Sequence, residues 1–191
     1  GGIISNLYGG LMENCYCDVV MEISMTGDAT CGGLVGRSGI ASSLRNCVFA
    51  GKLVGKAAQR CGGLIGWVEG STSISNCLQL GEMDIDVNAD SYALGRNSEK
   101  EGKINNCYVL KGFRGTVDAG VTEVTSEQVE SGEVAFRAGM GQKLDTDKVP
   151  SPLNQNRVYA TATSCSGEGA TGFTNNKAEA QMPEHSFTCL L

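Results

Sequence analysis

The sequence predicts an all-β fold, namely a right-handed parallel β-helix of about four coils of roughly 30 residues each, with a small C-terminal α/β cap. Three observations predict it: two motifs that recur with one period, short segments that alternate apolar and polar residues, and an excess of glycine. The 191 residues include 27 glycines and only 3 prolines. That balance favours many tight bends over a disordered linker.

The first repeated motif is glycine-rich. Residues 31–36 read Cys-Gly-Gly-Leu-Val-Gly and residues 61–66 read Cys-Gly-Gly-Leu-Ile-Gly. Residues 91–95 form a degenerate copy, Ser-Tyr-Ala-Leu-Gly, in which Tyr-Ala replaces the glycine pair. The leucines of these copies, Leu34, Leu64 and Leu94, are 30 residues apart. Residues 2–4 lie about one step earlier, and we expect them to end a further copy.

The second repeated motif is an Asn-Cys pair that recurs at steps of 32, 30 and 30 residues. Its copies are Asn14-Cys15, Asn46-Cys47, Asn76-Cys77 and Asn106-Cys107. Helical repeats need longer runs of 3.6-residue periodicity, and glycine breaks helices. Two motifs that keep one period therefore predict stacked β coils.

The clearest strand signal lies at residues 82–90, which alternate strictly between apolar and polar side chains. This pattern predicts a half-buried strand with Met83, Ile85, Val87 and Ala89 on one face. Further strands are expected within residues 19–25, 61–66 and 73–78. Each repeat would then hold about three short strands joined by tight turns.

Equivalent residues of successive coils should stack as ladders, because neighbouring parallel strands lie about 4.8 Å apart. The leucines of the glycine-rich motif form one predicted interior ladder. Of the nine cysteines, four would form a second ladder at the Asn-Cys motif, and Cys31 with Cys61 a third. Stacked side chains point the same way, a poor geometry for a disulfide, so we predict free thiols that fill the core. The redox state of Cys165 and Cys189 stays open. The asparagines are expected at turns, where they tolerate left-handed backbone.

The repeat stops after residue 110, and we place the domain boundary between residues 1–119, the solenoid, and residues 120–191, the cap. Thr125 and Gln128 have the spacing of a helix capping box, which predicts a helix over about 126–138. Residues 157–163 read as a short strand. Such a cap would cover the open end of a solenoid, whose unpaired backbone invites association.

Charge excludes two classes of partner. The formal net charge is −6 and no basic run occurs, so nucleic acids and anionic membrane surfaces are not expected partners. No stretch approaches the roughly 20 apolar residues of a membrane span. The chain begins in the middle of a repeat, and we expect it to be part of a larger surface protein or a mature chain without its targeting segment.

Catalytic and metal motifs are scarce. The single histidine, His185, belongs to no His-Glu-x-x-His motif, so no zinc-peptidase site of that kind is expected. His185 could form a catalytic pair with one of the cysteines, or a metal site with Cys189 that residues outside this chain would complete. A mobile tail is the favoured interpretation. We therefore predict no catalytic residue, no metal and no cofactor.

The acidic residues of the 82–90 strand are the weak candidates for ligand binding. Asp84, Asp86 and Asp90, with Asn88, have the oxygen spacing of a calcium loop. However, Ala89 replaces the glycine of such a loop, and Gly95 stands where its last glutamate would be. A solvated strand face is the favoured interpretation, with a weak cation or sugar site as the alternative.

The glycine-rich motif of residues 31–36 and 61–66 resembles the GLUG repeat of bacterial cell-surface proteins, which occurs in adhesin-like proteins of gut bacteria and in non-catalytic parts of some IgA-cleaving metallopeptidases. The resemblance covers residues 1–110, and residues 125–159 look similar to the segment that often follows such repeats. It implies a secreted or cell-surface location and carries no catalytic residue onto this chain.

The predicted function is therefore a non-catalytic extracellular module. It would be either an adhesin-like binder of a host glycan or protein, or a structural spacer. The alternatives are a polysaccharide-degrading β-helix enzyme, recognisable by product release, and an accessory region of a surface peptidase.

Overall fold

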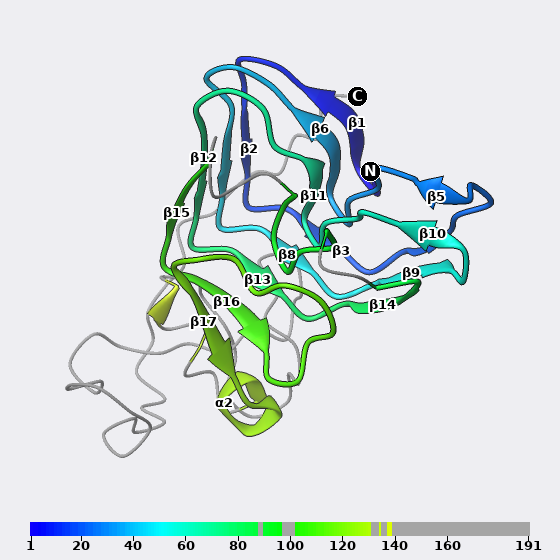
Figure 1. The fold of residues 1–191 in the computed structure, drawn as a ribbon. Helices are drawn as coiled ribbons and strands as arrows, with labels where there is room; N and C mark the ends of the chain where they lie inside the picture. The colour runs from blue at the N-terminus through cyan, green and yellow to red at the C-terminus, as the bar shows by residue number, and fades with distance from the viewer. Residues whose placement is uncertain (88–89, 97–101, 131–133, 135–136, 139–191) are drawn as a thin grey trace.

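The structure is a computed structural model that describes residues 1–87, 90–96, 102–130, 134, 137 and 138. It confirms the predicted parallel β-solenoid, which is nearly all β and makes about three turns where the sequence predicted about four coils (Figure 1). The first turn holds β1 (Ile4–Leu7), β2 (Leu11–Glu13), β3 (Tyr16–Cys17), β4 (Val20–Glu22) and β5 (Gly27–Asp28). The second holds β6 (Val35–Ser38), β7 (Ser43–Arg45), β8 (Val48–Phe49), β9 (Lys52–Gly55) and β10 (Ala58–Gln59).

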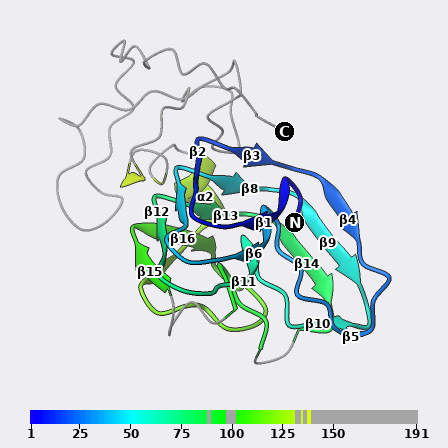
Figure 2. The same cartoon turned by 90° about the horizontal axis from the view of Figure 1, so that it is seen from above.

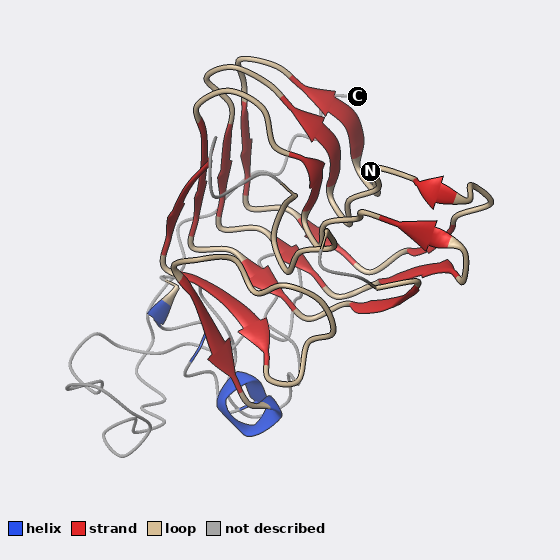
Figure 3. Ribbon diagram, viewed as in Figure 1, coloured by secondary structure: helices blue, strands red, loops and turns tan. Residues whose placement is uncertain are grey.

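The third turn holds β11 (Ile65–Trp67), β12 (Thr72–Ser75), β13 (Leu78–Gln79) and β14 (Glu82–Ile85). It is followed by β15 (Gly102–Asn105), β16 (Cys107–Leu110), β17 (Val121–Val124) and the helix α2 (Ser126–Glu130). Figure 3 shows how strands dominate the described chain and how little of it is helical.

Equivalent strands of successive turns pair in parallel and build the walls of the solenoid. The larger sheets run in the orders β1-β6-β11, β15-β12-β7-β2, β17-β16-β13-β8-β3 and β14-β9-β4. Figure 2 shows β4, β9 and β14 side by side when the molecule is seen from above. Steps of about 30 residues in the sequence thus become single steps between neighbouring strands, as with Glu82 beside Lys52.

The leucines of the glycine-rich motif form the predicted interior ladder. Leu34, Leu64 and Leu94 are all fully buried. The backbone N–H of Leu34 donates to the carbonyl of Leu64, and that of Leu64 donates to Leu94, each at 2.9 Å. Glycine is needed beside them, because a Cβ on Gly33 would lie 2.3 Å from the carbonyl oxygen of Gly63. The repeated glycine pair therefore allows the coils to approach closely.

The Asn-Cys motif forms a turn followed by an interior thiol, as predicted. The four asparagines have left-handed φ values of 51–55°, which Asn tolerates better than most residues. The amide of Asn46 donates to Asn14 at 3.1 Å, and that of Asn106 donates to Asn76 at 2.8 Å. All seven cysteines that the structure describes are free. The prediction of free thiols is confirmed for those seven; five of them are buried, whereas Cys15 and Cys31 are half-buried against the core. Cys165 and Cys189 lie outside the described residues.

Two sequence predictions of strand structure differ from the fold. The first two turns each hold five short strands, whereas the sequence predicted about three, because left-handed residues such as Asn14 and Asn46 divide the runs. The strand predicted over residues 82–90 ends at Ile85. Within it the predicted alternation holds, with Met83 and Ile85 buried and Glu82 and Asp84 exposed.

The chain after the last repeat continues one sheet and then forms the predicted helix start. β17 pairs in parallel with β16. The hydroxyl of Thr125 accepts from the N–H of Gln128 at 3.3 Å, and the side chain of Gln128 accepts from the N–H of Thr125 at 2.9 Å. This is the capping box that the sequence predicted. The strand predicted at 157–163 and His185 lie outside the described residues.

The helical segment packs against the side of the solenoid. A second buried cluster, separate from the interior core, joins strands β8, β13, β16 and β17 to this segment. Val48 belongs to it while the next residue, Phe49, belongs to the interior core, because successive residues of a strand point to opposite faces. The members of the second cluster are Val48, Leu78, Tyr108, Val124, Val129, Val134 and Ala138.

Candidate ligand-binding pocket

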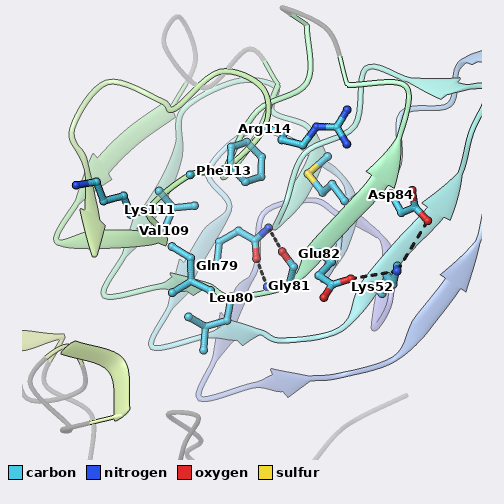
Figure 4. A pocket seen from close by; sticks show the side chains of 13 residues that line it. Lys52, Gln79, Leu80, Gly81, Glu82, Asp84, Val109, Lys111, Phe113 and Arg114 are labelled. Carbon is cyan, nitrogen blue, oxygen red and sulfur yellow. Dashed lines mark hydrogen bonds and ion pairs between the residues drawn. The ribbon is translucent and has the colours of Figure 1, made fainter. Parts of the chain in front are cut away.

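A pocket of about 490 Å³ opens on the side of the solenoid, between β14 and the turn that follows β16 (Figure 4). Its two sides come from segments about 30 residues apart in the sequence: residues 79–84 and residues 109–114. Lys52 of β9 completes the lining. A volume of this size lies within the range of small-molecule sites.

The corner between β13 and β14 forms one side of the pocket, and it is held rigidly. Gln79 is buried, and its amide donates to the carbonyl of Gly81 at 3.1 Å while its oxygen accepts from the N–H of Gly81 at 2.5 Å. A Cβ on Gly81 would lie 2.4 Å from the ring of Phe49. The corner is therefore fixed by a side-chain clamp and by close packing.

Charges on the β14 side are paired with each other. Lys52 Nζ lies 3.0 Å from Glu82 Oε2 and 3.8 Å from Asp84 Oδ2. The hydrogen bond to Glu82, together with the negative charges of both carboxylates, raises the pKa of Lys52. Lys52 thus offsets much of the negative charge at this end of the pocket.

The turn after β16 forms the other side and carries an aromatic ring between two cations. Gly112 and Gly115 have positive φ values of 84° and 112°, and they let the chain turn twice within a few residues. Phe113 is half-buried, whereas Lys111 and Arg114 are exposed. Figure 4 shows Phe113 and Arg114 beside each other, with Lys111 at the opposite end of this side. Within the described part of the chain, no ion pair involves either cation.

The three aspartates that the sequence proposed as weak ligand-binding candidates do not form one site, because each interacts with a different partner. Asp84 lines the pocket and pairs with Lys52. Asp86 accepts a hydrogen bond from Gln59 Nε2 at 2.6 Å, and Asp90 pairs with Arg60 at 3.0 Å. Among the described residues, no three His, Cys, Asp or Glu side chains are placed to hold a metal ion. Asn88 and Ala89 lie outside the described residues.

A second polar cluster surrounds Asp28, after β5, and its groups bind one another. Asp28 accepts hydrogen bonds from Thr30 at 2.8 Å, Arg96 at 2.8 Å and Arg60 at 3.3 Å. Partial desolvation raises the pKa of Asp28, but these hydrogen bonds outweigh it and hold the pKa below its usual value. Arg96 also stacks over the ring of Trp67 at 4.5 Å. The cluster ties three coils together at one corner.

Sequence reasoning missed the side of the pocket that carries Phe113. Lys111, Phe113 and Arg114 belong to no repeat, and no periodic pattern draws attention to them. The available signal was the segment Lys-Gly-Phe-Arg-Gly, three residues after the last Asn-Cys motif, in which two glycines enclose an aromatic and a basic residue and a lysine precedes them.

Comparisons with known proteins identify the fold and not a family. No protein-family model matches the chain, and no curated protein matches it. A solved structure, the crystal structure of a putative immunoglobulin A1 protease from Bacteroides ovatus, is similar over 74% of this chain with a TM-score of 0.52 and 19% sequence identity. The chain spans 47% of the length of that protein. In the described part of the chain, no helix has the length and apolar character of a membrane span. At this identity the likeness shows a shared β-solenoid.

Proposed function

We propose that the chain is a non-catalytic module of an extracellular bacterial protein and that it binds a glycan in the pocket beside Phe113. The observation that carries the proposal is the composition of the pocket. One side offers a half-buried aromatic ring and the rim offers charged groups. A sugar ring has a face of C–H groups that packs on an aromatic ring, and hydroxyls that bond to charged side chains.

The arrangement of carboxylates supports a binding role over hydrolysis. Glycoside hydrolases place two carboxyl groups on opposite sides of the scissile bond. The carboxylates that line this pocket, Glu82 and Asp84, are both on β14, and Lys52 bridges them. A sugar in the pocket would meet both carboxylates on the same side.

An accessory region of a surface peptidase is the second candidate. It is favoured by the structural neighbour, which is described as a putative immunoglobulin A1 protease and is about twice as long as the region it shares with this chain. In that case the solenoid would hold or present a substrate that another part of a longer protein cleaves. A pure spacer would have no saturable ligand.

The test is a panel of host glycans, mucins and plant polysaccharides, measured for both saturable binding and release of cleaved product. We expect saturable binding without cleavage, and binding should fall about tenfold or more in Phe113→Ala. The matched control is Tyr8→Ala, which removes an aromatic side chain that is 58% exposed and belongs to the first turn, away from the pocket lining. Release of product would refute the non-catalytic role, and an absence of binding across the panel would favour the spacer.

A further inference from the structure

The lining of the pocket has more positive than negative side chains, whereas the chain as a whole is negatively charged. The sequence has a net charge of −6, yet the pocket lining contains three cations and two carboxylates. The carboxylates share one cation, Lys52, at one end. The excess positive charge therefore lies on the turn that carries Phe113.

The two cations of that turn are available to a ligand. Lys111 and Arg114 are exposed, and among the described residues neither forms an ion pair. Five of the other arginines and lysines, Arg37, Arg45, Lys52, Arg60 and Arg96, each pair with a carboxylate. Arg114 differs from these five, because it lies beside the ring of Phe113 and its charge is not used in an ion pair among the described residues.

We propose that the pocket selects a glycan that carries a carboxylate, namely a sialic acid or a uronic acid. The proposal rests on the proposed function, because it names the class of glycan for the same pocket. The guanidinium of Arg114 binds the sugar carboxylate through two parallel N–H···O bonds, a geometry that suits Arg better than Lys. Phe113 packs against the C–H face of the same sugar.

The other side of the pocket sets the orientation of the sugar. Glu82 and Asp84 accept hydrogen bonds from hydroxyls and repel a second carboxylate. An acidic sugar would therefore enter with its carboxylate toward Arg114 and its hydroxyls toward β14. Figure 4 shows these groups on different sides of the pocket.

The experiment measures binding of sialyllactose, lactose, oligogalacturonate and a neutral plant oligosaccharide to the intact chain by titration calorimetry. We expect one acidic sugar to bind at least about tenfold more tightly than its neutral counterpart, and the sialylated and uronate arms show which acid is selected. Arg114→Gln should remove that preference, whereas Arg114→Lys should restore part of it. Added salt should weaken binding of the acidic sugar more than that of the neutral one.

The matched control is Lys103→Gln, which removes the same charge from an exposed residue of β15, outside the pocket lining. It should leave the preference unchanged. If acidic and neutral sugars bind equally and Phe113→Ala weakens both, the acidic selectivity is refuted while glycan binding in the pocket stands. If none of the sugars binds, both proposals fail.

Discussion

The two ends of the solenoid, its first turn and the residues after its third turn, differ in how their outermost groups are covered. In the first turn, large apolar side chains are exposed on the outside of the strands and loops. They are Tyr8, Leu11, Val19, Val20 and Met25. At two of these positions the second turn carries a polar residue instead: Leu11 lies beside Ser43, and Val20 lies beside Lys52. At these two positions the second and third turns are polar where the first is apolar, whereas Ile40 of the second turn is exposed as well.

At the other end, a buried carboxylate completes the backbone hydrogen bonding. In the inner turns, the N–H of each motif leucine donates to the motif leucine of the next turn. Leu94 has no such leucine after it, and its N–H donates instead to Asp118 Oδ2 at 2.8 Å. The other oxygen of Asp118 accepts from the N–H of Gly95 at 3.2 Å. Asp118 is 2% exposed, so it replaces the carbonyl groups of a further coil.

The comparison shows that the two ends pose different problems at this corner. The leucine ladder points its N–H groups toward the C-terminal end, and a buried N–H without an acceptor is costly. A carboxylate can accept two of these bonds at once. In the first turn the corresponding N–H groups already have an acceptor, because Ile3 and Ile4 both donate to the carbonyl of Leu34.

The largest effect should come from Asp118→Ala. It leaves the N–H groups of Leu94 and Gly95 without their acceptors, and we expect the free energy of unfolding to fall by about 3 kcal/mol. Urea denaturation followed by circular dichroism measures this fall. Asp118→Asn keeps one acceptor oxygen and should lose less. An unchanged urea midpoint in Asp118→Ala would contradict the role assigned to this carboxylate.

A smaller difference should separate the first and the last asparagine of the Asn-Cys motif. Asn106 donates to Asn76 at 2.8 Å and to the carbonyl of Arg137 at 2.7 Å, and its oxygen accepts from the hydroxyl of Tyr108. Asn14 accepts one bond, from Asn46 at 3.1 Å. We expect Asn106→Ala to cost about 2 kcal/mol and Asn14→Ala about 1 kcal/mol. The left-handed strain cancels in this comparison, because their φ values are 53° and 55°. Equal losses in the two variants would show that the additional hydrogen bonds of Asn106 contribute nothing to stability.

The sequence predicted the repeated features and the local capping box at Thr125, but it missed the groups whose roles depend on distant, non-repeated neighbours. The leucine ladder and the asparagines at turns follow directly from the repeat of about 30 residues in the sequence. Asp118, Phe113 and Arg114 lie in residues 111–118, after the last repeat, and their roles depend on neighbours such as Leu94 and Glu82 that are far away in the sequence. Asp84 was identified as an exposed acidic residue of β14, but its pairing with Lys52 depends on the register between turns.

The thiols should also distinguish the two ends, through their reactivity. Cys15 and Cys31 are partly exposed, whereas Cys107 is fully buried. A hydrogen bond from the thiol of Cys61 lowers the pKa of Cys31 to about 7, against the opposing effect of its burial. The reactive thiolate of Cys31 therefore accumulates as the pH rises through about 7, while a thiol with the ordinary pKa of 9.0 stays protonated.

We expect iodoacetamide to modify Cys31 in the folded protein, with a rate that rises around pH 7, and to spare Cys107 until the chain unfolds. Peptide mass spectrometry over a pH series measures both. Cys61→Ala should move the rise for Cys31 toward higher pH, while Cys61→Ser keeps a donor and should preserve it. Modification of Cys107 at the rate of Cys31 in native conditions would overturn the distinction between the ends.

The smallest effect concerns the outer surface of the first turn. Val20 is 64% exposed and lies directly beside Lys52, which pairs with Glu82 in the next strand. Val20→Glu should extend this row of alternating charges and stabilise the fold by about 0.5 kcal/mol, since directly opposite unlike charges on neighbouring strands attract. Val20→Lys is the matched control, because it places a like charge at the same position and should destabilise by a similar amount. The gap between the two variants, measured by urea denaturation, should shrink in high salt. If the gap is absent at low salt, the exposed valine differs from its polar counterparts for a reason other than charge pairing along the strand row.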